Sequence, residues 1–527
     1  MSTFVAFAPS WLRFIGLGSV AVAQDWPQIL GPNRNGIYTG PGIVSWFPRT
    51  GPPQIWIRDV GAGFSGPALA GDQLILFHRV NNRETVEAMD ALTGKTAWIF
   101  AYATAYRDDF GFDEGPRAVP VIAGGRVFAH GADGWLHGID FETGKMLWSV
   151  DTRRVFEAPK GYFGVASSPV VDANRVLVNV GGKTGGIVAF DAGTGKTLWT
   201  ATSDEPSYSA PIVADINRQH TAVFFTRTGL VALDPSNGKV LYQHRWRARM
   251  AASVNAATPI VLNDQIFLSS SYGTGAVLLK VANNTVTPVW SGDESMSNHY
   301  STSVLKDGYL HGFDGRQEFG QTLRCVELAT GKVMWNVDGF GAGSLLIAGD
   351  TLVVTRESGE LALAPASPKA FRFSARAQLL KGVVRAYPAL ASGRYYVRNE
   401  RQLAGVRSQQ AVTMRTGSYV NGQCVHPTSS EVGRNINPAD TKDVIAEFPL
   451  ATAADVRLAV DAAVEAFKSW KRTPGPERGR VLWRAADISR RRVDEIAQTL
   501  TREEGKILKE ARGEVMKGIS LLGVLRG

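Results

Sequence analysis

The alternation of apolar and polar residues divides the chain into two parts with different periods. Before residue 407, short segments such as "LHGID" and "LVALD" show the apolar alternation of half-buried strands, and glycine-containing turns separate them. After residue 450, Val456, Val460, Val464 and Phe467 recur at spacings of four and three, which is the period of an amphipathic helix. The pattern predicts a mainly β region followed by a helical region.

One phrase recurs along the β region and marks a structural repeat. Its copies share an acidic residue, a Gly-Lys turn and an aromatic residue, and they occupy Asp90–Trp98, Asp140–Trp148, Asp191–Trp199, Asp234–Tyr242 and Glu327–Trp335. The aromatic residues lie 50, 51, 43 and 93 positions apart, and a degenerate copy ending at Trp290 divides the last interval. The acidic side chain can accept turn amides, glycine supplies positive φ, and the aromatic residue can pack between repeats. A strand repeat of this length is typical of a β-propeller.

A second marker counts the repeats independently. Strand starts rich in small residues occur around Pro67, Pro120, Pro169, Pro211, Pro259, Ser303, Ser344 and Pro388. The final repeat lacks an outer aromatic strand, whereas an unassigned strand surrounds Trp56. Because a closed ring leaves no open sheet edge, we expect this N-terminal strand to complete the last repeat. The sequence therefore predicts a mainly β fold, an eight-bladed propeller over residues 25–407 with about four strands in each blade.

Composition and charge exclude several functional classes. The chain is 44% hydrophobic and 20% charged, so packed domains are expected. The net charge of +9 is dispersed, with Arg490–Arg492 as its one short basic run, so no nucleic-acid partner is expected. The two cysteines, Cys325 and Cys424, are too few for a disulfide framework or a cysteine-rich metal site.

The first 23 residues have the pattern of a secretory signal peptide. Phe14–Ala23 is a short apolar run, Arg13 precedes it, and Ala21-Val22-Ala23 matches the small-x-small cleavage pattern. A buried N-terminal segment is the alternative. The run is too short to span a bilayer, and no later segment is long enough. We therefore expect residues 1–23 to be a signal peptide, the propeller to be periplasmic or secreted, and the chain to have no transmembrane segment.

Several stretches of the β region resemble the PQQ-like β-propeller repeat proteins. They are the repeated turns together with "DWPQILGPNRNGI" at Asp25–Ile37, "SNHYSTSVLKDGYLHGFDGR" at Ser297–Arg316 and "GRYYVRNERQLAGV" at Gly393–Val406. The superfamily contains quinoprotein alcohol and glucose dehydrogenases as well as non-catalytic relatives such as the outer-membrane-protein assembly lipoprotein. The alcohol dehydrogenases carry a vicinal cysteine pair and a calcium ion beside the quinone. This sequence has no adjacent cysteines and no clear calcium-ligand cluster, so we expect no cofactor, with PQQ and calcium as the alternative.

Any propeller site is expected in the central funnel, where the innermost strands begin. The candidate residues are Arg117, Tyr162, Tyr208, Asn255, His299 and Tyr300. A histidine at a strand start can instead be a hydrogen-bonded structural group, and the neighbouring Asp113–Arg117 stretch can be a solvated loop. We assign no catalytic residue, no cofactor-binding residue and no metal ligand. The funnel is expected to take a protein or small-molecule partner whose identity the sequence leaves open.

The helical region begins with a predicted hairpin and continues as three helical stretches. "SYVNGQCV" has Asn-Gly at its turn, Thr452 and Asp455 form a capping-box pattern, and Pro474 and Pro476 separate the first helix from the second. The third stretch is "VDEIAQTLTREEGKILKEARGEV". We assign its Glu503–Lys506 segment a structural role.

Residues 417–515 closely resemble the N-terminal part of the NAD(P)-dependent aldehyde dehydrogenases. The resemblance rests on "YVNGQ", "INPADTKDVIAEFPLATAADVRLAVDAAVEAFKSWKRTPGPERGRVLWRAADI" and "LTREEGKILKEARGEV". It implies a truncated α/β segment that covers roughly the first quarter of such an enzyme. The dinucleotide loop, the base glutamate and the nucleophilic cysteine that the family uses are missing from this chain. NAD(P) is therefore implied only by the family, which is normally cytoplasmic.

Residues 408–416 form a seam between the propeller and the incomplete dehydrogenase segment at 417–527. The propeller is expected to close by Arg407, and Met414 precedes the second resemblance. A sequencing error or frameshift that joins two reading frames would explain this arrangement, and a genuine gene fusion is the alternative.

The sequence favours an extracytoplasmic, non-catalytic binding or assembly scaffold with an inert dehydrogenase fragment. The alternative is an oxidoreductase, either through a quinone in the funnel or through NAD(P)-dependent aldehyde oxidation. Whether the chain is an enzyme stays open at this point.

Overall fold

The computed structural model describes residues 24–524 except 41–42, 44–46, 48–50, 251–252, 409–413, 416–417, 422, 426–430 and 442–443. The expected signal peptide lies outside the described residues. The chain divides into two compact units, residues 1–409 and residues 410–527, and each is described by itself. In the part of the chain that the structure describes, no helix has the length and apolar character needed to cross a membrane.

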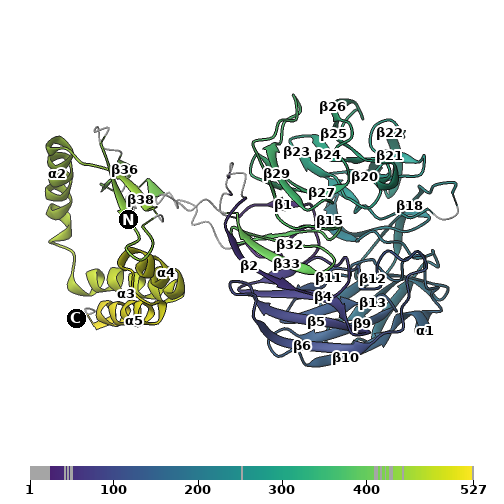
Figure 1. The fold of residues 1–527 in the computed structure, drawn as a ribbon, viewed down its shortest axis with the longest axis horizontal. Coiled ribbons are helices and arrows are strands. Elements are labelled where there is room, and N and C mark those ends of the chain that lie inside the picture. Colours follow the sequence, from purple (N-terminus) through teal and green to yellow (C-terminus); the bar gives the residue numbers. More distant parts are fainter. Residues whose placement is uncertain are drawn as a thin grey trace, which may run out of the picture. The chain divides into compact units, whose positions relative to one another are not determined.

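The first unit is an eight-bladed β-propeller, which confirms the predicted fold (Figure 1). Blades 1 to 4 each contain four antiparallel strands: β3 (Ala68–Ala70), β4 (Gln73–Val80), β5 (Arg83–Asp90) and β6 (Thr96–Ala103); β7 (Val121–Ala123), β8 (Arg126–His130), β9 (Trp135–Asp140) and β10 (Met146–Asp151); β11 (Val170–Asp172), β12 (Arg175–Gly182), β13 (Gly185–Asp191) and β14 (Thr197–Ala201); β15 (Ile212–Ile216), β16 (Gln219–Phe225), β17 (Gly229–Leu233) and β18 (Val240–Arg245). The short helix α1 (Thr152–Phe156) connects blades 2 and 3.

Blades 5 to 8 continue the same order. They comprise β19 (Ile260–Leu262), β20 (Gln265–Ser270), β21 (Gly275–Ala282) and β22 (Thr285–Gly292); β23 (Val304–Lys306), β24 (Tyr309–Asp314), β25 (Thr322–Glu327) and β26 (Val333–Val337); β27 (Gly343–Ala348), β28 (Thr351–Arg356), β29 (Glu360–Pro365) and β30 (Ala375–Gln378), with β1 (Ile37–Tyr38) parallel to β27; β31 (Ala389–Ala391), β32 (Arg394–Arg398), β33 (Gln402–Arg407) and β2 (Gln54–Asp59). The 3₁₀ turn η2 (Gln317–Phe319) connects β24 and β25.

The N-terminal strand β2 closes the ring, as the sequence predicted. It pairs antiparallel with β33, from Gln54 opposite Val406 to Asp59 opposite Gln402. The last blade therefore combines strands from both ends of the propeller region, and no blade keeps an unfinished outer edge.

The repeated turns hold neighbouring blades together. In the first copy, the Asp90 carboxylate accepts the backbone N–H of Thr93 at 2.7 Å and the Thr93 hydroxyl at 2.8 Å. Gly94 has a φ of +67°, and a Cβ at this position would lie 2.8 Å from the Trp56 ring. Glycine is therefore required both for the left-handed backbone and for the close approach of an indole from the neighbouring blade.

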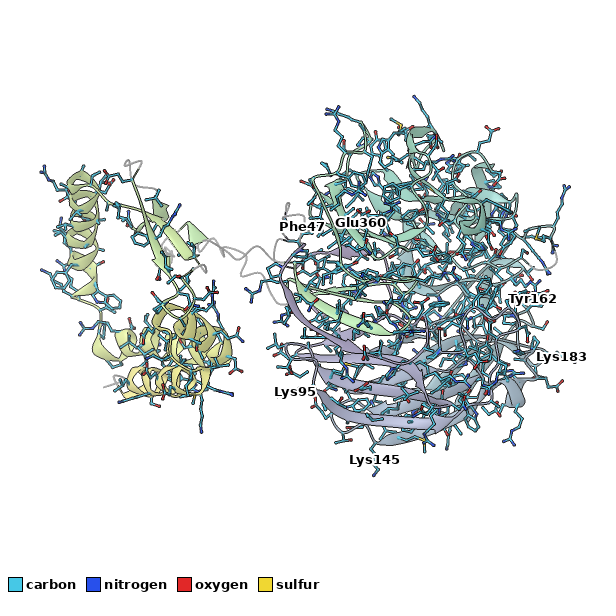
Figure 2. The ribbon with its side chains drawn as sticks, in the orientation of Figure 1. Phe47, Lys95, Lys145, Tyr162, Lys183 and Glu360 are labelled. Atoms are coloured by element: carbon cyan, nitrogen blue, oxygen red, sulfur yellow. The ribbon has the colours of Figure 1, made fainter. Side chains whose placement is uncertain are left out.

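Each repeat tryptophan also donates a hydrogen bond across the blade boundary. Trp98 Nε1 donates to the Phe141 carbonyl at 2.9 Å, and Trp148 Nε1 donates to the Ala192 carbonyl at 3.0 Å. Trp56 makes the equivalent bond from the last blade to the Ala91 carbonyl of the first, at 3.0 Å. The turn lysines Lys95 and Lys145 are exposed and project from the margin of the propeller (Figure 2).

The propeller core lies between adjacent blades. One cluster joins Phe128 and Trp148 of blade 2 to Val176, Val178 and Phe190 of blade 3. Cys325 on β25 is fully buried and free, and burial raises the pKa of its thiol to about 12. It therefore packs as a small apolar residue.

The second unit consists of short strands and four helices. Its elements are β34 (Met414–Arg415), β35 (Ser418–Val420), β36 (Gln423–Val425), β37 (Val432–Ile436), β38 (Val444–Pro449), α2 (Ala453–Trp470), α3 (Gly475–Arg491), α4 (Val493–Glu504) and α5 (Leu508–Val524). The predicted hairpin forms between β35 and β36, and the capping box of Thr452 and Asp455 begins α2. The prediction of one continuous third helical stretch was wrong. Gly505, with a φ of +70°, ends α4, and α5 begins separately at Leu508.

The apolar side of α2 is not covered in this unit. Val456, Val460, Val464 and Phe467 are each more than half exposed, and none of the described residues of α2 is buried. In the α4–α5 connection, Lys506 pairs with Glu504 at 2.5 Å and with Glu514 at 2.7 Å. The Glu503–Lys506 segment thus joins two helices, in agreement with a structural role.

Candidate functional site

The N-terminal segment of residues 24–40 crosses the centre of the propeller. Trp26 bridges to Leu69 in the innermost strand of blade 1, and β1 pairs with the innermost strand of blade 7. Between these points, Arg34 reaches the starts of blades 3 and 4. One guanidinium nitrogen donates to the Pro211 carbonyl at 2.8 Å, and the other donates to the Pro169 carbonyl. The segment is therefore bonded to blades 1, 3, 4 and 7, and Pro27 and Gln24 also accept backbone N–H groups from blades 2 and 8.

Arg34 is only 3% exposed, and its neighbour on the same segment supports it. Its Nε donates to Gln28 Oε1 at 2.8 Å. Burial lowers the pKa of the Arg34 guanidinium to about 9, so the group stays a cation at neutral pH. Charged donors on neutral carbonyls make strong hydrogen bonds, and these bonds fix the segment in the channel.

Cavities lie on both sides of this segment. Gln28 and Arg34 line a cavity of about 670 Å³ together with the innermost strands of blades 3 to 6. Ile29 lines a smaller cavity of about 200 Å³, whose other residues precede the innermost strands. We call this smaller cavity the funnel pocket. It lies where the sequence placed the candidate site, and the segment forms part of its wall.

The funnel pocket has mainly aromatic walls. Its lining includes seven aromatic side chains, which are Phe64, Phe112, Phe163, Tyr208, Tyr272, Tyr300 and Tyr387. The charged or titratable side chains at the pocket are Arg117, His299, Glu318 and Arg385. Loops from most of the blades thus contribute to one small aromatic site.

Both arginines of the funnel pocket face aromatic rings and are paired with carboxylates. The Arg117 guanidinium carbon lies 5.7 Å from the centre of the Phe64 ring, and Asp108 lies 3.5 Å from one of its nitrogens. The Arg385 guanidinium carbon lies 5.5 Å from the centre of the same ring, and Arg385 forms an ion pair with Glu357. These contacts orient two planar cations against one ring and leave little net charge in the pocket.

The histidine of the funnel pocket is neutral and only partly hydrogen-bonded. His299 Nε2 lies 2.8 Å from the Tyr272 hydroxyl, and burial lowers the pKa of the imidazole. His299 Nδ1 and the Tyr300 hydroxyl are buried and have no hydrogen-bond partner among the described residues. Burial also raises the pKa of the Tyr300 hydroxyl, which therefore stays protonated. Two residues of the pocket lining thus each hold one buried polar atom without a partner among the described residues.

The structure brings together four of the six residues that the sequence singled out. Arg117, Tyr208, His299 and Tyr300 line the funnel pocket. Asn255 does not, because its amide donates to the Thr226 carbonyl at 2.9 Å and accepts the Ser270 hydroxyl at 2.8 Å. It is a buried structural group between two loops.

Tyr162 also lies outside the lining of the funnel pocket. Its ring centre is 6.3 Å from that of Phe110, and Arg227 lies 5.1 Å above it. In the neighbouring stretch, Asp113 accepts the backbone N–H of Gly63 at 3.1 Å and that of Gly115 at 2.6 Å. Asp113 therefore positions a half-buried loop.

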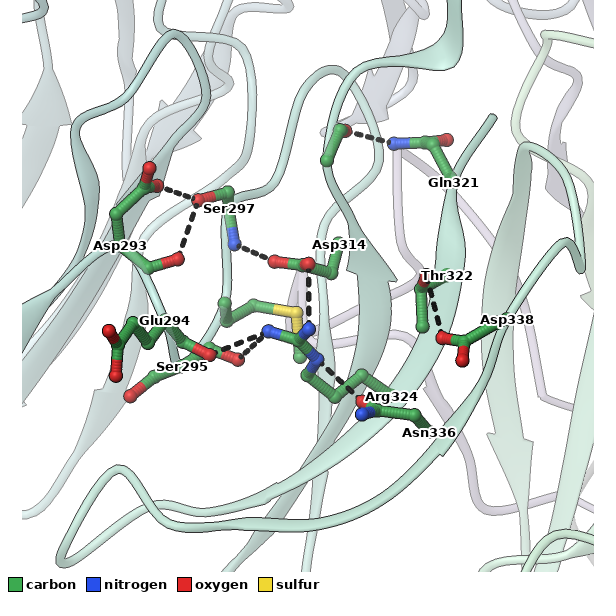
Figure 3. A network of polar contacts seen from close by, with 12 residues as sticks. Asp293, Glu294, Ser295, Ser297, Asp314, Gln321, Thr322, Arg324, Asn336 and Asp338 are labelled. Atoms are coloured by element: carbon green, nitrogen blue, oxygen red, sulfur yellow. Dashed lines mark hydrogen bonds and ion pairs between the residues drawn. The ribbon is translucent and has the colours of Figure 1, made fainter. Parts of the chain in front are cut away.

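A polar network in blade 6 positions the loop that carries His299 and Tyr300 (Figure 3). Arg324 on β25 donates to the carbonyls of Glu294 and Ser295 at 2.7 and 2.9 Å, and it pairs with Asp314 at 3.0 Å. The Asp314 carboxylate in turn accepts the backbone N–H of Ser297 at 2.7 Å. Arg324 thus ties the approach to the pocket onto the blade.

Replacing Arg324 with methionine is expected to destabilise the propeller by about 2 kcal/mol, because it leaves Asp314 and two carbonyls without their shared partner. The Arg324 and Asp314 side chains are 14% and 16% exposed, so water can replace part of the lost interaction and limits the destabilisation. The shift of the urea midpoint measures the effect. Arg154→Met, at an arginine side chain that is 84% exposed, is the control and should leave the midpoint unchanged. Equal midpoints for the two variants would contradict the role of the network.

Comparison with known proteins agrees with both units. Residues 82–337 match the family model described as outer membrane protein assembly factor BamB, and residues 425–526 match the aldehyde dehydrogenase family. The chain joins a PQQ-like propeller to an aldehyde dehydrogenase segment. Both resemblances seen in the sequence are thereby confirmed.

Solved structures share the fold of the PQQ-like propeller. The crystal structure of BamB from Moraxella catarrhalis is 15% identical, with a TM-score of 0.50 over 67% of this chain and 97% of that chain. The quinohemoprotein alcohol dehydrogenase from Comamonas testosteroni is 14% identical, with a TM-score of 0.51 over 75% of this chain and 82% of that chain. Identities this low establish the fold and leave the function open.

The aldehyde dehydrogenase segment has closer relatives. It is 42% identical to the alpha-ketoglutaric semialdehyde dehydrogenase of Bacillus subtilis over 110 residues. This alignment covers 21% of this chain and 22% of the relative. It is 43% identical over 104 residues to the alpha-ketoglutarate semialdehyde dehydrogenase of Haloferax volcanii, 20% of this chain and 22% of the relative. The chain spans about a fifth of the length of the curated relatives it matches.

The residues of the funnel pocket do not fit a calcium-bound quinone. Glu318 is the one carboxylate in the pocket lining, and Arg316 pairs with it at 3.2 Å. Within the described ranges, no three His, Cys, Asp or Glu side chains gather in a way that could hold a metal ion. A cavity of about 200 Å³ is also below the roughly 300–1,000 Å³ of sites that enclose drug-sized ligands. The donor set and the size of the pocket therefore favour a smaller, metal-free occupant.

Proposed function

We propose that this chain is a non-catalytic binding scaffold that acts outside the cytoplasm and holds a protein partner at the face around the funnel pocket. The observation that carries the proposal is the character of the pocket. Its arginines are paired with carboxylates, and its walls are aromatic. Such a site offers contact area and orientation, which are the properties of a binding site.

The one histidine of the pocket is poorly placed for proton transfer. A general base works best with a pKa near the working pH, whereas burial lowers the pKa of His299. Its Nε2 is occupied by Tyr272. The match to the BamB family model supports protein binding and a location outside the cytoplasm, since that family's description names outer-membrane assembly.

Site-specific photocrosslinking tests the proposal in cells that make the full chain. A benzoylphenylalanine at Phe319, which is 79% exposed beside the funnel pocket, should give one discrete crosslinked protein. The same probe at Leu262, which lines the larger cavity on the other side of the segment, is the matched control and should not. Absence of a crosslink at Phe319, or equal crosslinks at both positions, would contradict the scaffold.

The proposal also predicts that the protein does not retain a quinone. After incubation with pyrroloquinoline quinone and Ca²⁺ and removal of free ligand by gel filtration, we expect no stoichiometric quinone absorbance and no dye-linked alcohol oxidation. A quinoprotein dehydrogenase treated in parallel is the positive control. A bound chromophore at one per chain would establish the oxidoreductase alternative instead.

We further propose that the seam at residues 408–416 is a join of two reading frames, one for the propeller and one for the aldehyde dehydrogenase segment. Resequencing the locus across the seam separates this from a genuine fusion. A single open frame running through the seam would contradict the join.

A further inference from the structure

Exposed phenylalanines surround the mouth of the funnel pocket. Phe110 is 52% exposed, Phe112 is 49% exposed and Phe319 is 79% exposed. Phe112 lines the pocket, and the centre of the Phe110 ring lies 6.3 Å from the centre of the Phe112 ring. Phe319 directly follows Gln317 and Glu318, which also line the pocket. Large apolar side chains held this far into solvent beside a pocket are typical of protein interaction sites.

Contacts within the propeller hold these phenylalanines in place. The Phe110 ring is 5.1 Å from Phe163, and Arg316 lies 5.1 Å from the Phe319 ring. Arg385 lies 5.4 Å from the Phe112 ring. The three residues therefore form a supported apolar rim, and we use that name for them below. A preformed rim avoids part of the ordering cost of binding.

The funnel pocket inside this rim is suited to a single aromatic side chain. Its volume of about 200 Å³ is below that of sites for drug-sized ligands. Its walls offer aromatic edges and faces, and two guanidinium planes lie against Phe64. Aromatic rings gain from stacking and from edge-to-face contacts with such walls, whereas branched aliphatic side chains gain only from burial.

Unpartnered polar atoms distinguish among aromatic side chains. The Tyr300 hydroxyl, His299 Nδ1 and Gln317 Oε1 belong to the pocket lining, are buried and have no hydrogen-bond partner among the described residues. A phenol hydroxyl can donate to one of these atoms and accept from the Tyr300 hydroxyl, and an indole N–H can donate to one of them, whereas a phenylalanine ring can do neither. A buried polar atom left unpaired costs free energy, so the pocket should prefer a ring that carries a polar group.

We propose that the funnel pocket receives a tyrosine or tryptophan side chain of the protein partner, while the apolar rim packs against the partner's flanking residues. The proposal rests on the proposed scaffold function and specifies its recognition element. Buried aromatic anchors surrounded by an apolar and polar margin carry much of the energy in many protein interfaces. The partner is thereby defined by its chemistry, an exposed Tyr or Trp in an otherwise apolar segment.

The test uses the full chain and short blocked peptides, Gly-Gly-X-Gly-Gly, with X as Tyr, Trp, Phe or Leu. Saturation-transfer NMR titration measures their binding. We expect the Tyr and Trp peptides to bind at least about tenfold more tightly than the Leu peptide, a difference of about 1.4 kcal/mol. Equal binding of the Leu peptide would overturn the proposal.

Two variants locate the bound ring. Ala166→Leu fills the funnel pocket and should abolish binding, whereas Ala214→Leu places the same extra volume in the larger cavity and should not. Tyr300→Phe removes a hydroxyl that has no partner, so it should preserve the fold and bring binding of the Tyr peptide down to that of the Phe peptide. Unchanged binding in both Ala166→Leu and Tyr300→Phe would place the ring elsewhere and contradict the proposal.

The peptide titration and the photocrosslink test the two proposals separately. A crosslink at Phe319 without selective peptide binding would remove the aromatic anchor and leave the scaffold function standing. Selective peptide binding without a crosslink in cells would identify a pocket for small phenols or indoles, and it would contradict the protein-partner proposal.

Discussion

Replacing Trp56 with alanine is expected to destabilise the propeller by about 3–5 kcal/mol, the usual cost of removing a buried indole. Trp56 is 9% exposed, its ring lies against Gly94 and Gly405, and its Nε1 donates to the Ala91 carbonyl. The other repeat tryptophans join blades that follow each other in the chain. Trp56 instead joins the last blade to the first, so its loss weakens the closure of the ring. The urea midpoint measured by far-UV circular dichroism gives the effect.

Two variants in the same strand control for local damage. Ile57→Ala alters a neighbouring side chain that is 39% exposed, and it should change the free energy of unfolding by less than about 1 kcal/mol. Trp56→Phe keeps an aromatic ring and loses the hydrogen bond, so it should fall between the two. In limited proteolysis, Trp56→Ala should release β2 before the blades are cut. If Trp56→Ala and Ile57→Ala have the same midpoint, the indole does not stabilise the closure.

The blades and their number could be predicted because their signals are local. Each turn places an acidic residue, a glycine and an aromatic residue within nine positions, for example Asp90 to Trp98. The structure shows why each of these residue types is needed. The carboxylate accepts turn amides, and the glycine leaves room for an indole ring. The closing strand near Trp56 was predictable for the same reason, since one blade lacked its aromatic strand.

The position of the funnel pocket could be predicted from the sequence, but not all of the residues that line it. Arg117, Tyr208, His299 and Tyr300 stand directly before innermost strands, so their position was predictable. Phe64 and Arg385 stand at the same place, four residues before β3 and β31, so the same signal could have found them. Phe112 and Tyr272 enter from loops that do not lead directly into an innermost strand, and no periodic pattern marks which side chains of those loops turn inward. Asn255 and Tyr162 had suitable positions but form other contacts, a hydrogen-bonded loop junction and a ring contact with Phe110.

The segment that crosses the channel shows another limit of sequence analysis. "DWPQILGPNRNGI" was useful as a family resemblance, yet nothing in it marked Arg34 as the residue that bonds to the starts of blades 3 and 4. That role depends on carbonyls more than a hundred positions away. In the second unit, by contrast, the helix break at Gly505 had a local signal, a glycine in the middle of a helical pattern.

Acidification is expected to destabilise the propeller through two buried histidines. His137 lies on β9, the third strand of blade 2, and His311 lies on β24, the second strand of blade 6. Both are buried, and neither ring nitrogen of either residue has a hydrogen-bond partner among the described residues. Burial lowers the pKa of each from the ordinary 6.5 to about 4. Between these values the unfolded chain binds the protons and the folded chain does not. Stability is therefore complete above pH 6.5 and falls as the pH decreases toward 4.

The double variant His137→Leu, His311→Leu isolates this effect. When the pKa of two histidines falls from 6.5 to about 4 on folding, the free energy of unfolding decreases by roughly 4 kcal/mol between pH 6.5 and pH 4.5. The urea midpoint of the variant should therefore change much less on acidification than that of the wild-type chain. At pH 7.5 the two proteins should differ little, because apolar side chains replace neutral, unpaired imidazoles. Glu84, whose pKa burial raises to about 7, acts in the opposite direction, but it is present in both proteins and cancels.

His220 provides a control of opposite sign. It is exposed and bonded to Asp172 and Asp215, which raise its pKa above the ordinary value. Its contribution to stability is present below pH 6.5 and is lost as the pH rises through the folded-state pKa. His220→Leu should therefore leave the acid sensitivity intact or increase it slightly, whereas the double variant reduces it. If the double variant and the wild-type chain lose stability in parallel from pH 6.5 to pH 4.5, the buried imidazoles are protonated in the folded state and burial does not control their titration.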